Sequence, residues 1–342
     1  MTQNTVPLGT PQVSSTRAMF GNFAGWAVSA LILGFTGACL LWLELKAGQV
    51  TMTTGFLADQ RNLDVIELPI SPTTIVPMNQ NMDAGELYRE AINEYRANRS
   101  AYDVYKMPAT APNPVGKSLP AIEKLLQATH ATRASIFERT PEVIVNYDLE
   151  RPPLNDLESL GNVCLDIALL TYQEHPDFAI KHAEAVFGLG HKLFLERLRF
   201  WEYFSGTGLM GGADAMLMRI YQIRGDTARY QAIKAFDDQR RVFHEKRIDN
   251  VRKVMWDISD AYIAREAGNV FFIAEHSKER MWRIEATLRI GLYKYNANSA
   301  GDQRAAKDRP AHWAQDMRLD PAVRHAAVLA DKLTLDGYHH LN

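Results

Sequence analysis

The 342-residue chain has only two cysteines, and they stand far apart. Cys39 lies in an apolar run and Cys164 in a helical segment, so a disulfide framework is excluded as the basis of the fold. The formal net charge of −2 also gives none of the clustered positive charge typical of nucleic-acid-binding proteins. With 46% hydrophobic and 23% charged residues, the composition indicates a folded protein rather than a disordered one.

The sequence also lacks the short motifs that mark metal, cofactor and nucleophile sites. Its ten histidines form no His-Glu-x-x-His, Glu-x-x-His or Cys-x-x-Cys-His pattern, and G-x-S-x-G and P-loop patterns are missing. We interpret Cys164 as a small core residue, and His182, His191 and His244 as surface or half-buried helix positions. We therefore predict no catalytic, cofactor-binding or metal-binding residues, and a protein that is not an enzyme.

Gly206 to Gly211 fits the dinucleotide-binding pattern G-x-G-x-x-G. That pattern binds phosphates only when it follows a strand and opens a helix. Here it follows a long amphipathic segment with helical periodicity. We interpret it as a glycine-rich break between two helices.

One long hydrophobic run stands near the N-terminus. Residues 23–43 carry no charge over 21 positions, and a helix of that length spans about 30 Å, the thickness of the hydrocarbon core. Trp26 and Trp42 stand near its two ends, where indoles favour the headgroup layer. A signal peptide or a lipoprotein signal at Cys39 fits less well, because the apolar core is long and no cleavage site follows. We predict a single-pass transmembrane helix within 19–46.

Small residues recur every four positions within this run. In lipid, that spacing lets two helix backbones approach closely. One interpretation is packing against another membrane helix; the other is that small residues are simply common in membrane spans. The residues concerned are Gly25, Ser29, Ala30, Gly34 and Ala38.

The rest of the chain divides by composition. Residues 1–18 are polar and predict a flexible tail. Residues 47–80 hold prolines at 69, 72 and 77, which forbid a long helix, so we expect an extended linker that either connects or lies on the domain surface. Residues 81–342 predict an all-α soluble domain. Basic residues near the span give a weak bias that favours the tail inside and the domain on the extracytoplasmic, periplasmic side.

The sequence of the predicted domain contains several signals that mark the start of a helix. Capping-box pairs occur at Asp83 with Glu86 and at Asn155 with Glu158. Pro120 stands at the first-turn position of a helix predicted over 121–137. Nearer the C-terminus, Ser277 is predicted to cap one helix and Asp320-Pro321 to open another. We expect two or three helices beyond residue 262.

A pattern of four residues, Tyr, Asp, Ala and Phe, occurs twice with an offset of 49 positions. Each tyrosine would close a first helix, each aspartate would cap a second, and the alanine and phenylalanine would pack that second helix closely. The spacing predicts a helix–turn–helix unit that buries its apolar face against its neighbour. The first copy is Tyr172, Asp177, Ala183 and Phe187, and the second is Tyr221, Asp226, Ala232 and Phe236.

This unit resembles the hairpin of tetratricopeptide repeats over residues 158–240. Tyr221, Gly225-Asp226 and the pair Ala232-x-x-x-Phe236 match that family's order most closely. The unit is longer than the family's repeat of about 34 residues, and its tyrosine-to-alanine distance is too long by about two. The resemblance implies an α-solenoid-like, right-handed helical stack that binds proteins. It names no active site.

Residues 229–253 hold eight basic residues interleaved with four acids. One interpretation is a patch that faces anionic lipid or an acidic partner. The other, which we favour, is a solvated helix side with i,i+4 ion pairs.

Two classes of function follow. The leading hypothesis is a membrane-anchored, non-enzymatic scaffold or accessory subunit that docks other membrane-complex proteins and needs no cofactor. The alternative is a membrane-tethered enzyme or ligand-binding protein with a pocket between helices. A deep polar pocket with convergent titratable groups would favour the alternative. A shallow face with exposed aromatics would favour docking.

Overall fold

The computed structural model describes residues 65–68, 70–78, 80–107, 110–135, 152–264 and 268–332. The predicted tail, the membrane helix with its packing residues and tryptophans, and the first part of the linker lie outside these ranges. Among the described residues, no helix is both long enough and apolar enough to cross a membrane. The chain divides into two compact units, Met1–Ala58 and Asp59–Asn342, and the structure below is that of the second.

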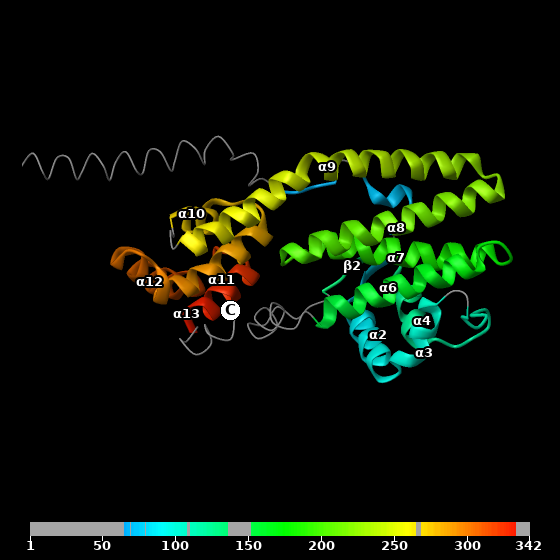
Figure 1. Ribbon diagram of the computed structural model, residues 1–342, viewed down its shortest axis with the longest axis horizontal. Helices are drawn as coiled ribbons and strands as arrows, with labels where there is room; N and C mark the ends of the chain where they lie inside the picture. Colours follow the sequence, from blue (N-terminus) through cyan, green and yellow to red (C-terminus); the bar gives the residue numbers. More distant parts are fainter. Residues whose placement is uncertain are drawn as a thin grey trace, which may run out of the picture. The chain divides into compact units, whose positions relative to one another are not determined.

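The described part of this unit is almost entirely helical, as the all-α prediction requires. It contains eleven α-helices and two short strands (Figure 1). The helices are α2 Gly85–Ala97, α3 Arg99–Asp103, α4 Pro120–Ala128, α6 Pro152–Thr171, α7 Pro176–Glu196, α8 Phe200–Arg224, α9 Thr227–Ala264, α10 Gly268–His276, α11 Arg280–Asn296, α12 Ala300–Gln315 and α13 Pro321–Lys332. The strands are β1 Gln80–Asp83 and β2 Ala131–Arg133, with 3₁₀ turns η2 Pro72–Thr74 and η3 Val104–Lys106.

The start of α2 differs from the predicted capping box. Ala84 is the N-cap, and Glu86 pairs with Arg89 instead of closing a box. Asp83 ends β1, where its Oδ1 accepts hydrogen bonds from the N–H groups of Gly85 at 2.9 Å and Ser135 at 2.8 Å. Because β2 pairs in parallel with β1, α4 ends at Ala128 and not at 137 as predicted.

Helices α6 to α9 pack in chain order, each against the next, and lie side by side in Figure 1. The glycine-rich segment explains the closeness of α7 and α8. A Cβ added to Gly206 would lie 2.7 Å from the carbonyl oxygen of Gly190 and from the backbone nitrogen of Phe194. The two backbones are therefore in direct contact. The predicted helix break was wrong: this segment lies inside α8, where its glycines serve helix packing.

Two further helix starts test the capping predictions. The box at Asn155 and Glu158 was wrong, because α6 already begins at Pro152 and Glu158 accepts a hydrogen bond from the Ser205 hydroxyl instead. The start at Asp320-Pro321 is confirmed: α13 begins at Pro321, and Asp320 accepts from the Ala322 N–H at 2.8 Å.

The C-terminal helices α10 to α13 pack among themselves around buried side chains of α11, chiefly Trp282, Ile290 and Tyr293. Ser277 does not cap α11 directly. Its hydroxyl oxygen accepts from the Glu279 N–H, just before the helix begins at Arg280. This region holds four helices, one more than the upper number predicted.

The described part of the predicted linker before β1, residues 65–68 and 70–78, contacts the helices; we call it the arm. Ile66 and Val76 are buried. The arm turns once, through η2, where the Ser71 hydroxyl accepts from the Thr73 N–H. Of the two predicted states of the linker, these residues adopt the one that lies on the domain surface.

Replacing Gly206 with alanine tests the backbone contact between α7 and α8. The new methyl group would clash with backbone atoms on both sides, so we expect a loss of roughly 1–3 kcal/mol in unfolding free energy. Chemical denaturation followed by circular dichroism measures it.

Gly208→Ala is the matched control. Gly208 lies in the same helix as Gly206, and a Cβ added to it meets nothing within 4 Å. This variant should gain stability, by up to about 1 kcal/mol from helix propensity. Equal unfolding midpoints for the two variants would contradict the close packing.

Candidate functional site

A polar pocket lies between the arm and the helical hairpins. It encloses about 400 Å³, within the size range of small-molecule sites. Its lining comes from the arm, the turn after α4, α7, the last turn of α8 and the first turns of α9. The residues are Thr74, Ile75, Pro77, His130, Glu184, Tyr221, Arg229, Ala232 and Ile233. Four of these side chains are titratable.

His130 joins the arm to the rest of the pocket. Its Nδ1 lies 2.8 Å from the carbonyl oxygen of Pro77. A carbonyl can only accept, so Nδ1 carries the proton and Nε2 is left to accept a hydrogen bond. The arm is thus held by a polar contact at the pocket wall.

Tyr221 and Arg229 contact each other in the same pocket. The Arg229 Nη1 donates to the Tyr221 hydroxyl oxygen at 3.1 Å, and the guanidinium carbon lies 5.4 Å from the ring centroid. Burial raises the pKa of Tyr221, so the phenol keeps its proton. Because its oxygen accepts from Arg229, the Tyr221 O–H is left to donate.

Glu184 supplies the acid. Burial raises the pKa of its carboxyl group, and the nearby His130 and Arg229 oppose that shift. No donor among the described residues hydrogen-bonds this carboxylate. The pocket therefore combines a half-buried acceptor with a cation and a hydroxyl donor.

The predicted repeat residues lie in two hairpins, α6–α7 and α8–α9, which are only partly equivalent. The rings of Phe187 and Phe236 meet edge to face with centroids 5.4 Å apart, so the two copies contact each other at the same position. Tyr172 and Ala183 are buried in the core between α6, α7 and α8. Ala232, by contrast, is exposed and lines the pocket. Ala183 and Ala232 thus occupy different environments.

The two predicted caps also differ. Asp226 caps α9, because its Oδ1 accepts from the Arg229 N–H at 3.1 Å, and Gly225 before it adopts the left-handed conformation with φ 69°. The cap at Asp177 was wrong. Since α7 begins at Pro176, Asp177 lies inside the first turn and pairs with Arg224.

A buried ion pair fixes the arm to two helix turns. Arg197, after α7, binds both carboxylate oxygens of Glu279, before α11, each at 3.0 Å. The Ile66 backbone completes the unit: its carbonyl accepts from Arg197 at 2.6 Å and its N–H donates to Glu279 at 2.9 Å. The side chains are 9% and 2% exposed. We call these three residues the arm clasp.

A second buried pair joins the turn between α7 and α8 to α11 itself. Arg199 binds both oxygens of Glu285, at 2.7 and 2.8 Å. Sequence reasoning missed all four of these charged residues. The segment Arg197-Leu198-Arg199 between two helices was a signal, but its acids stand more than 80 positions away and nothing in the sequence pairs them.

Glu202, in the first turn of α8, is buried beside these pairs. Its Oε2 accepts from the N–H groups of Leu198 and Arg199, while Oε1 has no hydrogen-bond partner. Burial raises the pKa of its carboxyl group to about 8.

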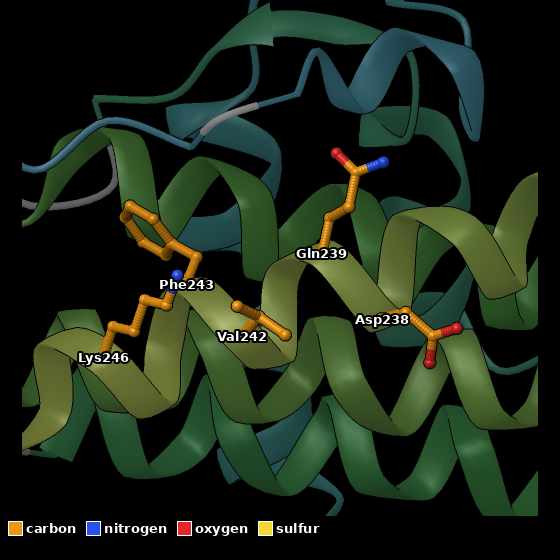
Figure 2. A pocket seen from close by; sticks show the side chains of 5 residues that line it. All are labelled: Asp238, Gln239, Val242, Phe243 and Lys246. Carbon is orange, nitrogen blue, oxygen red and sulfur yellow. The ribbon is translucent and has the colours of Figure 1, made fainter.

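A face of α9 presents a small apolar patch to solvent (Figure 2). Positions 238, 242 and 246 make one row at i,i+4 spacing, and positions 239 and 243 make a second. Val242 at the centre is 48% exposed. The Arg247 guanidinium lies 4.7 Å from the Phe243 ring centroid. We call Asp238, Gln239, Val242, Phe243 and Lys246 the α9 patch.

The first part of the basic stretch of α9, as far as Arg241, forms ion pairs, most of them within the same helix. Lys234 pairs with Asp238 at 2.7 Å, and Arg241 pairs with Asp237 at 3.0 Å, both at i,i+4 spacing. Arg240 points inward to Asp214. This confirms the ion-paired interpretation as far as Arg241. No acid among the described residues lies within ion-pair distance of Lys246.

The structure also tests the predictions for Cys164 and for three single histidines. Cys164 is fully buried and burial raises its thiol pKa, which confirms a core residue. The prediction for His182 and His191 was wrong, because α7 buries both; His244 is half-buried. Among the described residues, no three histidines, cysteines or acids gather where they could hold a metal ion.

Comparison with known proteins finds no matching family model, no similar curated protein and no similar solved structure. The resemblance to tetratricopeptide repeats therefore stays a prediction from the residues of the two hairpins.

Arg197→Met tests the arm clasp. The variant leaves Glu279 buried without its cation, so we expect a loss of about 3–5 kcal/mol in unfolding free energy. Arg224→Met removes an exposed ion pair with Asp177, whose side chains are 38% and 81% exposed, and should cost less than about 1 kcal/mol. Equal losses in urea denaturation would contradict a structural role for the clasp.

Glu202→Gln tests the buried carboxyl group by pH. The folded pKa of about 8 lies above the value of about 4.3 for an unfolded glutamate. The stability that the protonated Glu202 carboxyl group contributes to the folded state is therefore fully present below about pH 4.3. It declines as the pH rises and is lost above about pH 8. Stability of the wild type should fall more steeply than that of Glu202→Gln between pH 5 and 8. Parallel pH curves would contradict this assignment.

Proposed function

We propose that this chain is a membrane-anchored, non-enzymatic scaffold or accessory subunit that binds a partner protein on the α9 patch. The apolar run 23–43 would hold it in the membrane, with the helical domain on the extracytoplasmic side. The single observation that carries the docking role is the α9 patch, an exposed apolar centre bounded by charge on a 38-residue helix.

The chemistry of the patch favours a protein over a lipid surface. Its acid end, at Asp238, already pairs with Lys234 and Arg241, so these two cations are not free to meet anionic headgroups. The opposite end, at Lys246, has no acid partner among the described residues. An apolar centre with a polar rim is the usual composition of a protein interface.

The occupant that fits this pattern is an amphipathic helix of another protein. Two rows at i,i+4 spacing, Asp238–Val242–Lys246 and Gln239–Phe243, match the ridges of a second helix. An apolar side chain would cover Val242 and Phe243, and an acid would face Lys246. The helical-hairpin resemblance supports the same class of partner.

One observation favours the alternative hypothesis of a ligand-binding protein. The polar pocket brings four titratable side chains together between the arm and the hairpins. That site shares no lining residue with the α9 patch. The two roles are compatible in one molecule.

Val242→Glu tests the docking surface. A charge at the centre of the patch should reduce the co-purification of a partner from mild detergent by at least about tenfold, which corresponds to about 1.4 kcal/mol. Ile223→Glu is the matched control, because Ile223 is also exposed, at 56%, but lies at the end of α8. It should leave the yield of the complex unchanged.

Lys246→Glu should weaken the same complex, and more so at low salt, because it reverses the rim charge. Equal yields for Val242→Glu and Ile223→Glu would contradict docking at the patch. Loss of self-association alone, measured by light scattering, would assign the patch to a second copy, and loss of vesicle binding alone would assign it to lipid. Either result overturns the proposal.

A further inference from the structure

We propose that the polar pocket binds a small zwitterion, a molecule that carries one ammonium group, one carboxylate and a short apolar body. The arrangement of charge inside the pocket points to this class. Arg229 offers guanidinium donors, and Glu184 offers a carboxylate to which no described residue donates. One ligand group of each sign satisfies both.

The carboxylate of such a ligand would lie against Arg229 and Tyr221. A guanidinium suits a carboxylate because its N–H donors are arranged in a planar fork. Only one of these donors is used by the Tyr221 oxygen, at 3.1 Å, and Asp226 approaches the Arg229 Nε no closer than 3.7 Å. The Tyr221 O–H can donate to the same carboxylate.

The ammonium group would lie against Glu184. The carboxylate comes from the middle of α7, where it is half-buried and lacks a hydrogen-bonded partner among the described residues. A half-buried carboxylate with no hydrogen-bond donor loses part of its hydration, and an ammonium group offsets that cost by donating to it. His130 lines the same pocket, but its Nδ1 is committed to the Pro77 carbonyl oxygen.

Apolar side chains complete the site. Ile75 and Pro77 of the arm and Ile233 of α9 give it hydrocarbon walls. A cavity of about 400 Å³ accommodates a molecule with a short side chain. Other charge classes fit less well: a phosphate would place negative charge beside Glu184, and a simple amine would leave unused the Arg229 donors that neither the Tyr221 oxygen nor the Asp226 carboxylate, 3.7 Å away, engages.

The test uses the full chain in detergent and isothermal titration with each of the common L-amino acids. We expect at least one with an aliphatic side chain to bind. Its two truncated analogues then separate the contacts. For leucine, 3-methylbutylamine lacks the carboxylate and 4-methylpentanoate lacks the ammonium group, and each should bind at least about tenfold more weakly.

Two variants must change this selectivity in opposite directions. Glu184→Gln should remove the preference for the amino acid over its deaminated acid, while the preference over the amine stays. Arg229→Met should do the reverse. Glu174→Gln, an exposed position in the turn before α7, should change neither preference. A melting curve for each variant shows that it is folded.

Three results would overturn the proposal. The first is that no amino acid binds the wild-type chain at millimolar concentration. The second is that inorganic phosphate or the amine binds more tightly than the amino acid. The third is that both variants keep the wild-type preferences. None of these results bears on the α9 patch, so the docking role is tested separately.

Discussion

The structure depends on one buried electrostatic contact, the arm clasp. Arg197 and Glu279 neutralise each other and satisfy both polar backbone groups of Ile66. Three segments that are far apart in the sequence meet there: the arm, the turn between α7 and α8, and the turn before α11. A buried charge is expensive without its partner, so each segment specifies the position of the other two. The arm in turn supplies Ile75 and Pro77 to the polar pocket. The clasp thus helps to place the arm against the hairpins, together with the His130–Pro77 contact and the buried Val76.

Sequence reasoning predicted the fold class and two of the helix starts, while the capping predictions at Asp83, Asn155 and Asp177 were wrong. The all-helical class, the start of α13 at Pro321, the cap at Asp226 and the turn at Gly225 all depend on residues within a few positions of one another. The contact of Phe187 with Phe236 also agrees with the repeat, since equal spacing places both rings at one level of neighbouring helices. The glycines of α8 were misread for a physical reason. A glycine that permits close packing of two helices and a glycine that breaks a helix look alike until the neighbour, here Gly190, is known.

The sites were much less predictable. Tyr221 and Ala232 were predicted as repeat residues, yet both line the polar pocket. No sequence motif indicated that this pocket exists. His130 and Glu184 stand 54 positions apart and become neighbours only through the packing of the turn after α4 against α7. Arg197 and Glu279 show the same limit. Pairs of charged residues that are far apart in the sequence follow no periodic pattern. A single sequence therefore does not show which charged residues will pair. The α9 patch was foreseen only as a stretch of mixed charge.

We propose that the helical domain, held by its arm, presents the α9 patch to a partner protein of the same membrane assembly. Photo-crosslinking in intact membranes tests that claim most directly. A photoreactive amino acid at position 242 should yield a protein-sized adduct that is absent when the same group replaces Ile223, the equally exposed control on α8. Adducts with lipid only, or identical adducts at both positions, would contradict the account.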